Sequence, residues 1–126
     1  SDVFRGSVVS YASDVKHDVL GVAEGPVVTE DAARAMALGA RRVLGADVGI
    51  AATGVAGPDA QEGRRPGTVC LAIAIGAAGS GAAGEEPDLV ESVEVALPGR
   101  RRQVRELSVI SLLALLRRHL LAPPGP

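Results

Sequence analysis

Tyr11 and Lys16 form the first pair of residues whose types and spacing suit chemistry. Tyr11 is predicted to end a strand at 6–11, and Lys16 lies in the first turn of the predicted helix 13–20. Ligands of open α/β sheets bind beyond the carboxyl ends of strands, and a helix N-terminus lowers the pKa of an amine toward that of a usable base. Asp14 opposes this effect. The alternative is a packed Tyr and a solvated Lys, and spacing alone favours it.

The second constellation is the loop Thr53-Gly54-Val55-Ala56-Gly57-Pro58, which directly follows a predicted buried strand. A Gly-rich turn in this position presents backbone N–H groups to an anion or an amide oxygen. The loop is not a Walker loop, because no Gly-Lys-Ser/Thr follows, and no helix starts from it as a Rossmann fingerprint requires. An ordinary turn that uses Gly for positive φ is an equal alternative.

The third constellation is a group of four arginines at the start of the last predicted helix. Cations at a helix N-terminus oppose the helix dipole, which indicates an anionic ligand or partner nearby. Arg101 and Arg105 are four residues apart, so both could bind one phosphate, whereas Arg102 is expected to pair with Glu106. A solvated charge run remains the alternative, and spacing alone slightly favours it. The four arginines are Arg100, Arg101, Arg102 and Arg105.

Other reactive residue types give weaker indications. No His, Cys, Asp or Glu spacing matches a metal site, so we expect no metal, and nothing resembles a Ser-His-Asp arrangement. Cys70 lies in an apolar run and is expected to be a buried structural thiol. His17 adjoins Lys16 on an exposed turn, and His119 lies at a helix end that suits a cation.

Composition indicates a soluble globular domain. Hydrophobic residues make up 47% of the 126 residues, and the net charge of −2 gives no overall attraction for nucleic acid. One cysteine excludes an internal disulfide, no apolar stretch is long enough to span a membrane, and no signal peptide is visible, so we expect a cytoplasmic protein. The sequence holds twelve arginines and a single lysine, Lys16. This lysine is either an ordinary surface residue or stands at a position that requires an amine able to lose its proton.

The predicted elements give an α/β fold with a mixed sheet. Thr29 has the features of an N-cap, and the helix that it starts runs to about Leu44 with Met36 on its apolar stripe. Three strands are predicted at 47–52, 68–75 and 89–97. The connector 76–88 is Gly-rich and a poor crossover helix, so we expect the last two strands to pair antiparallel.

The last helix is expected to begin after Pro98-Gly99 and to run to about Leu121. From Leu107 onward it is apolar on most sides, which indicates packing on two faces or a subunit interface. We therefore expect a homo-oligomer. The domain is expected to span 1–121, with an unstructured tail at 122–126.

At these residues the chain resembles the CinA C-terminal domain family, which is characterised by nicotinamide mononucleotide deamidation. The resemblance is carried by FRGSVVSYASDVKHDVLGV, by GPVVTEDAARAMALGARRVLGADVGIAATGVAGPD, by PGTVCLAIA and by PGRRRQVREL, in this order over about Val3 to Leu113. The pairing of Y-x4-K with TG-x-AGP is specific, whereas either piece alone is weak. The resemblance favours a functional role for Tyr11, Lys16 and Thr53 over the packed Tyr, the solvated Lys and the ordinary turn considered above.

The resemblance implies a three-layer α/β/α domain and hydrolysis of a carboxamide to nicotinate mononucleotide and ammonia. It implies a serine nucleophile activated by a lysine, without metal or organic cofactor. Carried over, Lys16 is the base and Tyr11 its hydrogen-bonding partner, Thr53 and Gly54 line the substrate pocket, and Arg101 or Arg105 holds the phosphate.

The sequence departs from the family pattern in one respect. The family serine lies in a Glu-Ser-Cys-Thr-Gly-Gly motif upstream of the first match, and the 126 residues contain no such motif. Ser7 stands where the family usually has Gly and is not assigned as the nucleophile. We therefore expect an N-terminally incomplete domain. The competing hypothesis is a non-catalytic nucleotide-binding or oligomerisation domain, and a weaker one is a scaffold recruited through the last helix.

Overall fold

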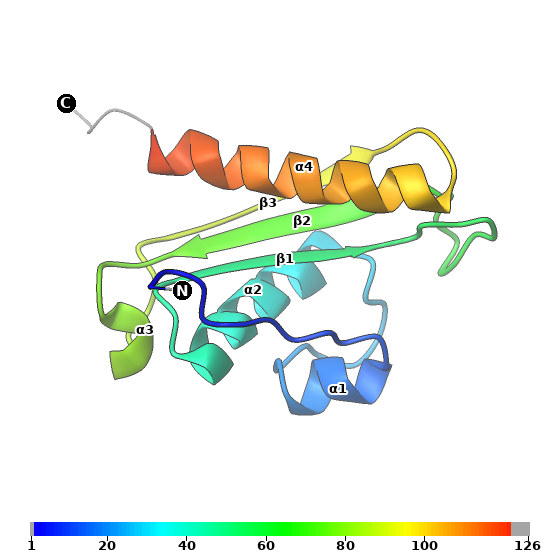
Figure 1. Cartoon of the computed structure of the whole chain (residues 1–126). Coiled ribbons are helices and arrows are strands. Elements are labelled where there is room, and N and C mark those ends of the chain that lie inside the picture. The colour runs from blue at the N-terminus through cyan, green and yellow to red at the C-terminus, as the bar shows by residue number, and fades with distance from the viewer. Residues whose placement is uncertain (1, 122–126) are drawn as a thin grey trace.

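The computed structural model describes residues 2–121, so Ser1 and the predicted tail 122–126 lie outside the described residues. The elements follow one another in an order close to the one predicted. They are α1 (Ser13–Asp18), α2 (Glu30–Leu44), β1 (Val48–Gly54), β2 (Thr68–Ile75), α3 (Ser80–Ala83), β3 (Leu89–Ala96) and α4 (Arg101–Leu120) (Figure 1).

The sheet has the order β1-β2-β3, and both strand pairs are antiparallel. The predicted antiparallel pairing of β2 with β3 is confirmed. The described strands pair only antiparallel, so they do not form the predicted mixed sheet; parallel neighbours are usually joined by a crossover helix, and neither connection contains a long one. Residues 55–67 form a loop between β1 and β2, and the connector 76–88 holds only the four-residue α3.

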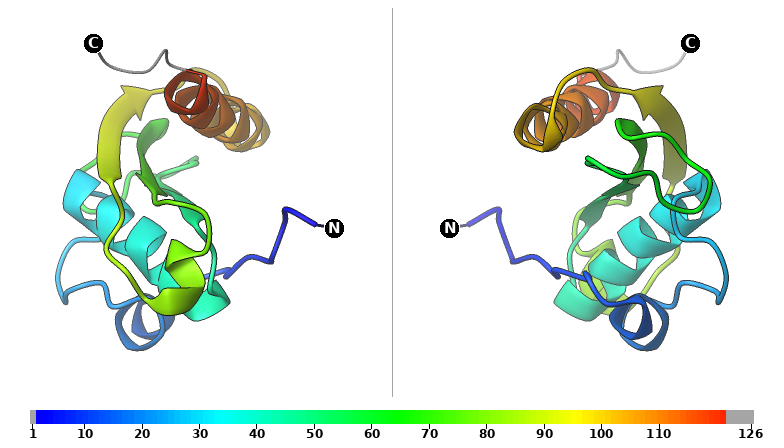
Figure 2. Two further views of the ribbon diagram at one scale, coloured as in Figure 1. Left: turned by 90° about the vertical axis from the view of Figure 1, so that its left-hand side faces the viewer. Right: turned by 90° about the vertical axis from the view of Figure 1, so that its right-hand side faces the viewer.

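The two long helices cover opposite faces of the sheet, so the α/β class and its three layers are confirmed (Figure 2). One core cluster joins α2 to the sheet through Met36, Ala37 and Cys70. The other joins α4 to the opposite face through Leu71, Ile73 and Leu112. The central strand β2 is therefore buried at six successive positions, as expected for a strand that is covered on both faces.

Helix α2 begins at the predicted cap, where the Thr29 hydroxyl accepts a hydrogen bond of 3.0 Å from Ala32 N–H. Two glycines let this helix approach its neighbours closely. A Cβ at Gly39 would collide with the backbone of Leu20, and one at Gly49 would collide with the Ala37 carbonyl. The close contacts hold the segment after α1 against α2 and α2 against β1.

Residues 6–11 do not form the predicted strand and take no part in the sheet. A strand is stabilised by its neighbour, and the described strands pair only with one another, which leaves β1 as an edge. In Figure 1 this N-terminal segment runs in the same direction as β1, and Figure 2 shows its first residues projecting away from the sheet.

Helix α4 packs on the sheet with one side only. Val104, Leu112 and Leu115 are buried, while Val109 and Ile110 are 58% and 63% exposed. The predicted apolar helix is thus confirmed, with one of its apolar sides left open in the single chain. None of the described helices is long and apolar enough to cross a membrane.

Candidate functional site

A cavity of about 1120 Å³ lies along the free edge of β1, and all six residues selected from the sequence line it. The N-terminal segment and α1 contribute one wall, β1 and the loop after it a second, and α4 a third. Pockets for small ligands commonly have volumes of roughly 300–1,000 Å³, so this open hollow is larger than most of them. The six residues are Tyr11, Lys16, Thr53, Gly54, Arg101 and Arg105.

The sequence predicted that Thr53 and Gly54 start a loop, but in the structure they are the last two residues of β1. The strand is longer because Thr53 and Gly54 pair with Cys70 and Val69 of β2. The Thr53 side chain is buried and its hydroxyl donates a 2.9 Å hydrogen bond to the Val27 carbonyl. A Cβ at Gly54 would lie 2.8 Å from the Thr68 carbonyl, so this position accepts only Gly without a shift of the backbone.

Lys16 lies on α1, and its amine donates a 2.7 Å hydrogen bond to the Ser10 carbonyl. Partial burial lowers the pKa of this amine below its usual value, while the negative charge of Glu62 raises it by a smaller amount. Burial, and not the helix dipole proposed from the sequence, is thus the main cause that the structure gives. An amine with a lowered pKa at the wall of a cavity is suited to accept a proton.

Tyr11 lines the same cavity but is 88% exposed. The hydrogen-bond acceptor of the Lys16 amine is the Ser10 carbonyl and not the Tyr11 hydroxyl that the resemblance suggested. The difference follows from the missing strand at 6–11, because no sheet neighbour orients the Tyr11 side chain. The assignment of a role to Tyr11 therefore stays a prediction.

The arginines of α4 divide into two kinds. Arg102 pairs with Glu106 at 3.1 Å on the surface, which confirms the predicted pair. Arg101 lines the cavity and also donates a 3.2 Å hydrogen bond to the Gly57 carbonyl, so it ties the loop after β1 to α4. Arg105 lines the cavity one helical turn further on. Two guanidinium groups at this wall can bind an anionic group of a ligand.

The chain also matches known proteins. The CinA C-terminal domain family matches residues 1–120. The chain belongs to this family. A CinA-like protein of Frankia casuarinae is 45% identical over 99% of the chain. Two solved CinA superfamily proteins have the same fold. One, from Enterobacter cloacae, is 32% identical with a TM-score of 0.76 over 90% of the chain and 64% of its own length. The other, from Escherichia coli, is 28% identical with a TM-score of 0.73 over 86% of the chain and 60% of its own length.

The chain spans about a quarter of the length of the curated CinA relatives that it matches, 28% of the Frankia protein and 25% of a Bacillus cytotoxicus protein. The match includes the segments with Tyr11 and Lys16, the end of β1 and the start of α4. The residues that the cavity brings together are therefore all part of the family domain.

Glu62 is a cavity residue of this CinA domain that the sequence analysis did not select. It lies in the loop 55–67, and its carboxylate accepts hydrogen bonds from Val27 N–H and Val28 N–H at 2.9–3.1 Å. Its φ of 53° is in the left-handed region, which is uncommon for a residue other than Gly. A turn around Glu-Gly was visible in the sequence, but the partner across the chain was not.

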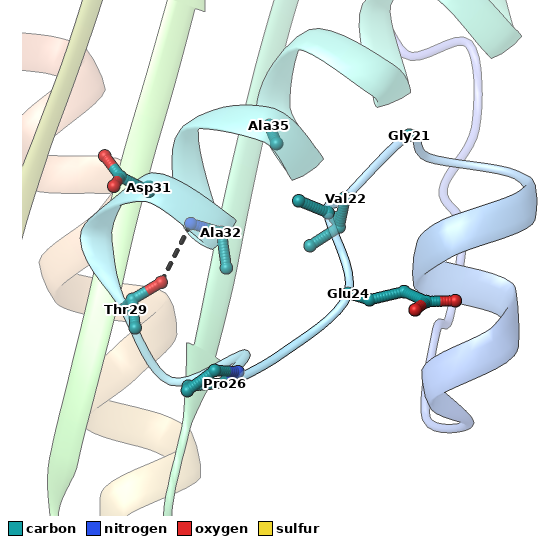
Figure 3. A pocket seen from close by; sticks show the side chains of 9 residues that line it. Gly21, Val22, Glu24, Pro26, Thr29, Asp31, Ala32 and Ala35 are labelled. Atoms are coloured by element: carbon teal, nitrogen blue, oxygen red, sulfur yellow. Dashed lines mark hydrogen bonds between the residues drawn. The ribbon is translucent and has the colours of Figure 1, made fainter.

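A second hollow of about 400 Å³ lies between the loop after α1 and the first turns of α2. Figure 3 shows it with the Thr29–Ala32 cap at its rim and the Glu24 side chain turned toward α1. None of the six selected residues lines this hollow. Of the two carboxylates that line it, Asp31 is paired with Arg34, and none of the residues predicted to act on a substrate contributes to it.

Cys70 is fully buried, as predicted, and burial together with the neighbouring Glu94 carboxylate raises the pKa of its thiol. Among residues 2–121 no group of three or more His, Cys, Asp or Glu side chains is placed to hold a metal ion. His17 Nδ1 donates a 2.7 Å hydrogen bond to the Val22 carbonyl and so fixes the turn after α1.

Proposed function

We propose that this chain supplies the base, the pocket wall and the phosphate-binding residues of an amidohydrolase that converts nicotinamide mononucleotide to nicotinate mononucleotide and ammonia. The observation that carries the proposal is the single cavity lined by Lys16, Thr53, Arg101 and Arg105. These residues come from α1, β1 and α4, so only the folded chain brings them together.

The substrate has two chemically different ends, a carboxamide and a phosphate. The arginines of α4 suit the phosphate, because a planar guanidinium can form two parallel hydrogen bonds to it. Arg105 is the better candidate, since Arg101 already donates to the Gly57 carbonyl. The carboxamide would then lie toward Lys16 and the end of β1.

The proposed reaction begins when the Lys16 amine takes the proton of a serine hydroxyl, whose oxygen attacks the carboxamide carbon. The carbon–nitrogen bond breaks, the proton passes to the departing nitrogen, and ammonia leaves. Water then cleaves the acyl-serine ester, which releases the nicotinate carboxylate and restores the hydroxyl. Membership of the CinA family supports a serine in this role. The sequence holds no Glu-Ser-Cys-Thr-Gly-Gly motif, and we assign the nucleophile to none of the described serines.

A second candidate function is nucleotide binding without turnover. The observation that favours it is the hydrogen bond from the Lys16 amine to the Ser10 carbonyl, together with the exposed Tyr11 side chain. In this arrangement the amine is held by backbone and is not activated by a side chain. Both candidates require the same arginines and the same cavity.

Ammonia release separates the two candidates. The complete natural protein and the 126-residue chain are each incubated with nicotinamide mononucleotide, and with nicotinamide riboside as the control that lacks the phosphate. Turnover of the nucleotide with weaker use of the riboside supports the amidohydrolase. Calorimetric binding of the nucleotide with no ammonia from the complete protein supports the binding domain and refutes the enzyme.

A further inference from the structure

Glu62 connects three parts of the cavity wall that are distant in sequence. Both of its carboxylate oxygens accept from Val27 N–H, at 3.1 and 3.0 Å, and Oε1 also accepts from Val28 N–H at 2.9 Å. The Val27 carbonyl in turn accepts the hydrogen bond from Thr53. The backbone at Val27 is thus held from both sides, by Glu62 at its N–H and by Thr53 at its C=O.

The turn that carries Glu62 is itself fixed. Gln61 and Arg64 exchange backbone hydrogen bonds of 3.2 and 2.7 Å, and the two residues between them, Glu62 and Gly63, both have positive φ. The Arg64 guanidinium pairs with Glu94 of β3 at 2.7 Å. A non-Gly residue is held at positive φ only where its surroundings stabilise it, and here the surroundings direct the Glu62 side chain across the chain to Val27.

We propose that Glu62 is a positioning residue of the cavity, which holds the 27–28 backbone against Thr53 and adds a negative charge to the cavity that Lys16 also lines. The inference deepens the proposed function and rests on it for its catalytic meaning. Its structural content, a clamp and a charge, is independent of any substrate.

The charge of Glu62 acts on Lys16 among several other groups. The attraction of the Glu62 carboxylate stabilises the protonated amine, so it opposes the lowering of the Lys16 pKa by burial. Other charged or titratable side chains lie on the elements that form the cavity wall, namely α1, the N-terminal segment and α4. They are Asp14, His17 and Asp18 on α1, Arg5 and Tyr11 on the segment, and Arg101 and Arg105 on α4.

The chain offers a direct readout of this charge, because Lys16 is its only lysine. In a chain labelled with ¹³C-lysine, the side-chain resonance of Lys16 is a single signal whose pH titration gives its pKa. The variants are Glu62→Gln, which removes the charge and keeps the shape, and Glu62→Ala, which also removes the acceptors. The matched control is Asp59→Asn, which removes one charge from the same loop.

We expect Glu62→Gln to lower the pKa of Lys16 below that of the parent chain and Asp59→Asn to leave it unchanged. In Glu62→Ala the backbone amides of Val27 and Val28 should exchange with solvent faster, by roughly tenfold for a lost hydrogen bond to a charged group. A Lys16 titration that is the same in all variants, or unchanged exchange at both amides, overturns the proposal.

Turnover by the complete protein provides the link to function. The acidic limb of its pH–rate profile should move to lower pH in Glu62→Gln and stay in place in Asp59→Asn. A limb that does not move while the Lys16 titration does shows that Lys16 is not the base, and so refutes the catalytic part of the inference. If the parent protein releases no ammonia, the proposed function fails. The pH titration of Lys16 and the amide exchange of Val27 and Val28 still test whether Glu62 holds the backbone there.

Discussion

Replacing Thr53 with Val removes one hydroxyl from the cavity wall and nearly nothing else, because the two side chains have similar shapes. The lost interaction is the 2.9 Å hydrogen bond from Thr53 to the Val27 carbonyl. A neutral hydrogen bond contributes about 0.5–1.5 kcal/mol, and a buried acceptor that is left without its donor costs about 1–3 kcal/mol. Because Thr53 is buried but Val27 is only partly buried, we expect the free energy of unfolding to fall by about 1 kcal/mol.

The assay is equilibrium unfolding by urea and by heat, with Thr53→Ser as the control that keeps the hydroxyl. A loss of this size lowers the melting temperature of a domain of this length by roughly 3–5 °C. Thr53→Ser keeps the donor but loses a buried methyl group, which by itself costs about 0.8 kcal/mol, so it serves to show whether the hydroxyl alone keeps the contact. Equal stability of Thr53→Val and the parent would refute the clamp at Val27.

Three further predictions follow from the same wall of the cavity. Gly54→Ala should lower the unfolding free energy by about 1–3 kcal/mol in denaturant titrations, because its Cβ would press on the Thr68 carbonyl, and a loss below about 0.3 kcal/mol would contradict the packing. Arg105→Ala should weaken nucleotide binding by calorimetry by roughly tenfold or more, while Arg102→Ala should not; equal effects would argue against a phosphate site. The lowered pKa of Lys16 predicts that its contribution to stability improves as pH rises from the folded-state pKa toward 10.5, since only the unfolded chain still holds the proton there. Lys16→Met should remove this rise from pH-dependent unfolding curves, and parallel curves would contradict it.

The helices and strands of the core could be predicted from the sequence where the pattern is local. The strand 68–75 was predicted with its observed bounds, because its run of apolar residues reflects burial on both faces. The Thr29 cap and the Arg102–Glu106 pair also depend on residues three or four apart. Such features need no knowledge of distant partners.

The features that failed depend on distant partners. Residues 6–11 have strand-forming composition, but a strand needs a neighbour and the described sheet supplies none. The end of β1 was placed two residues too early, because Thr53 and Gly54 become strand only through their pairing with β2. The Lys16 amine donates to the Ser10 carbonyl, and the role of Tyr11 stays a prediction.

The candidate site was predicted in its residues more than in its contacts. The family resemblance selected six residues, and the fold brings them to one cavity. Glu62 could not be found in this way, since its contacts to Val27 and Val28 span 34 and 35 residues. Its only local signal was a turn, and a turn does not show where its side chain reaches.

Lys16 is proposed to act as the base, and the substitution Lys16→Arg is the sharpest test of that role. Arginine keeps the positive charge and the length of the side chain, but its guanidinium does not release a proton at accessible pH. Ammonia release from nicotinamide mononucleotide is measured with the complete protein, with Lys16→Met as a second variant and with calorimetry to show that the nucleotide still binds. We predict that both variants bind the nucleotide and lose activity by about 10²–10⁴-fold, the usual contribution of a general base. Turnover by Lys16→Arg within a few-fold of the parent would show that Lys16 is not the base.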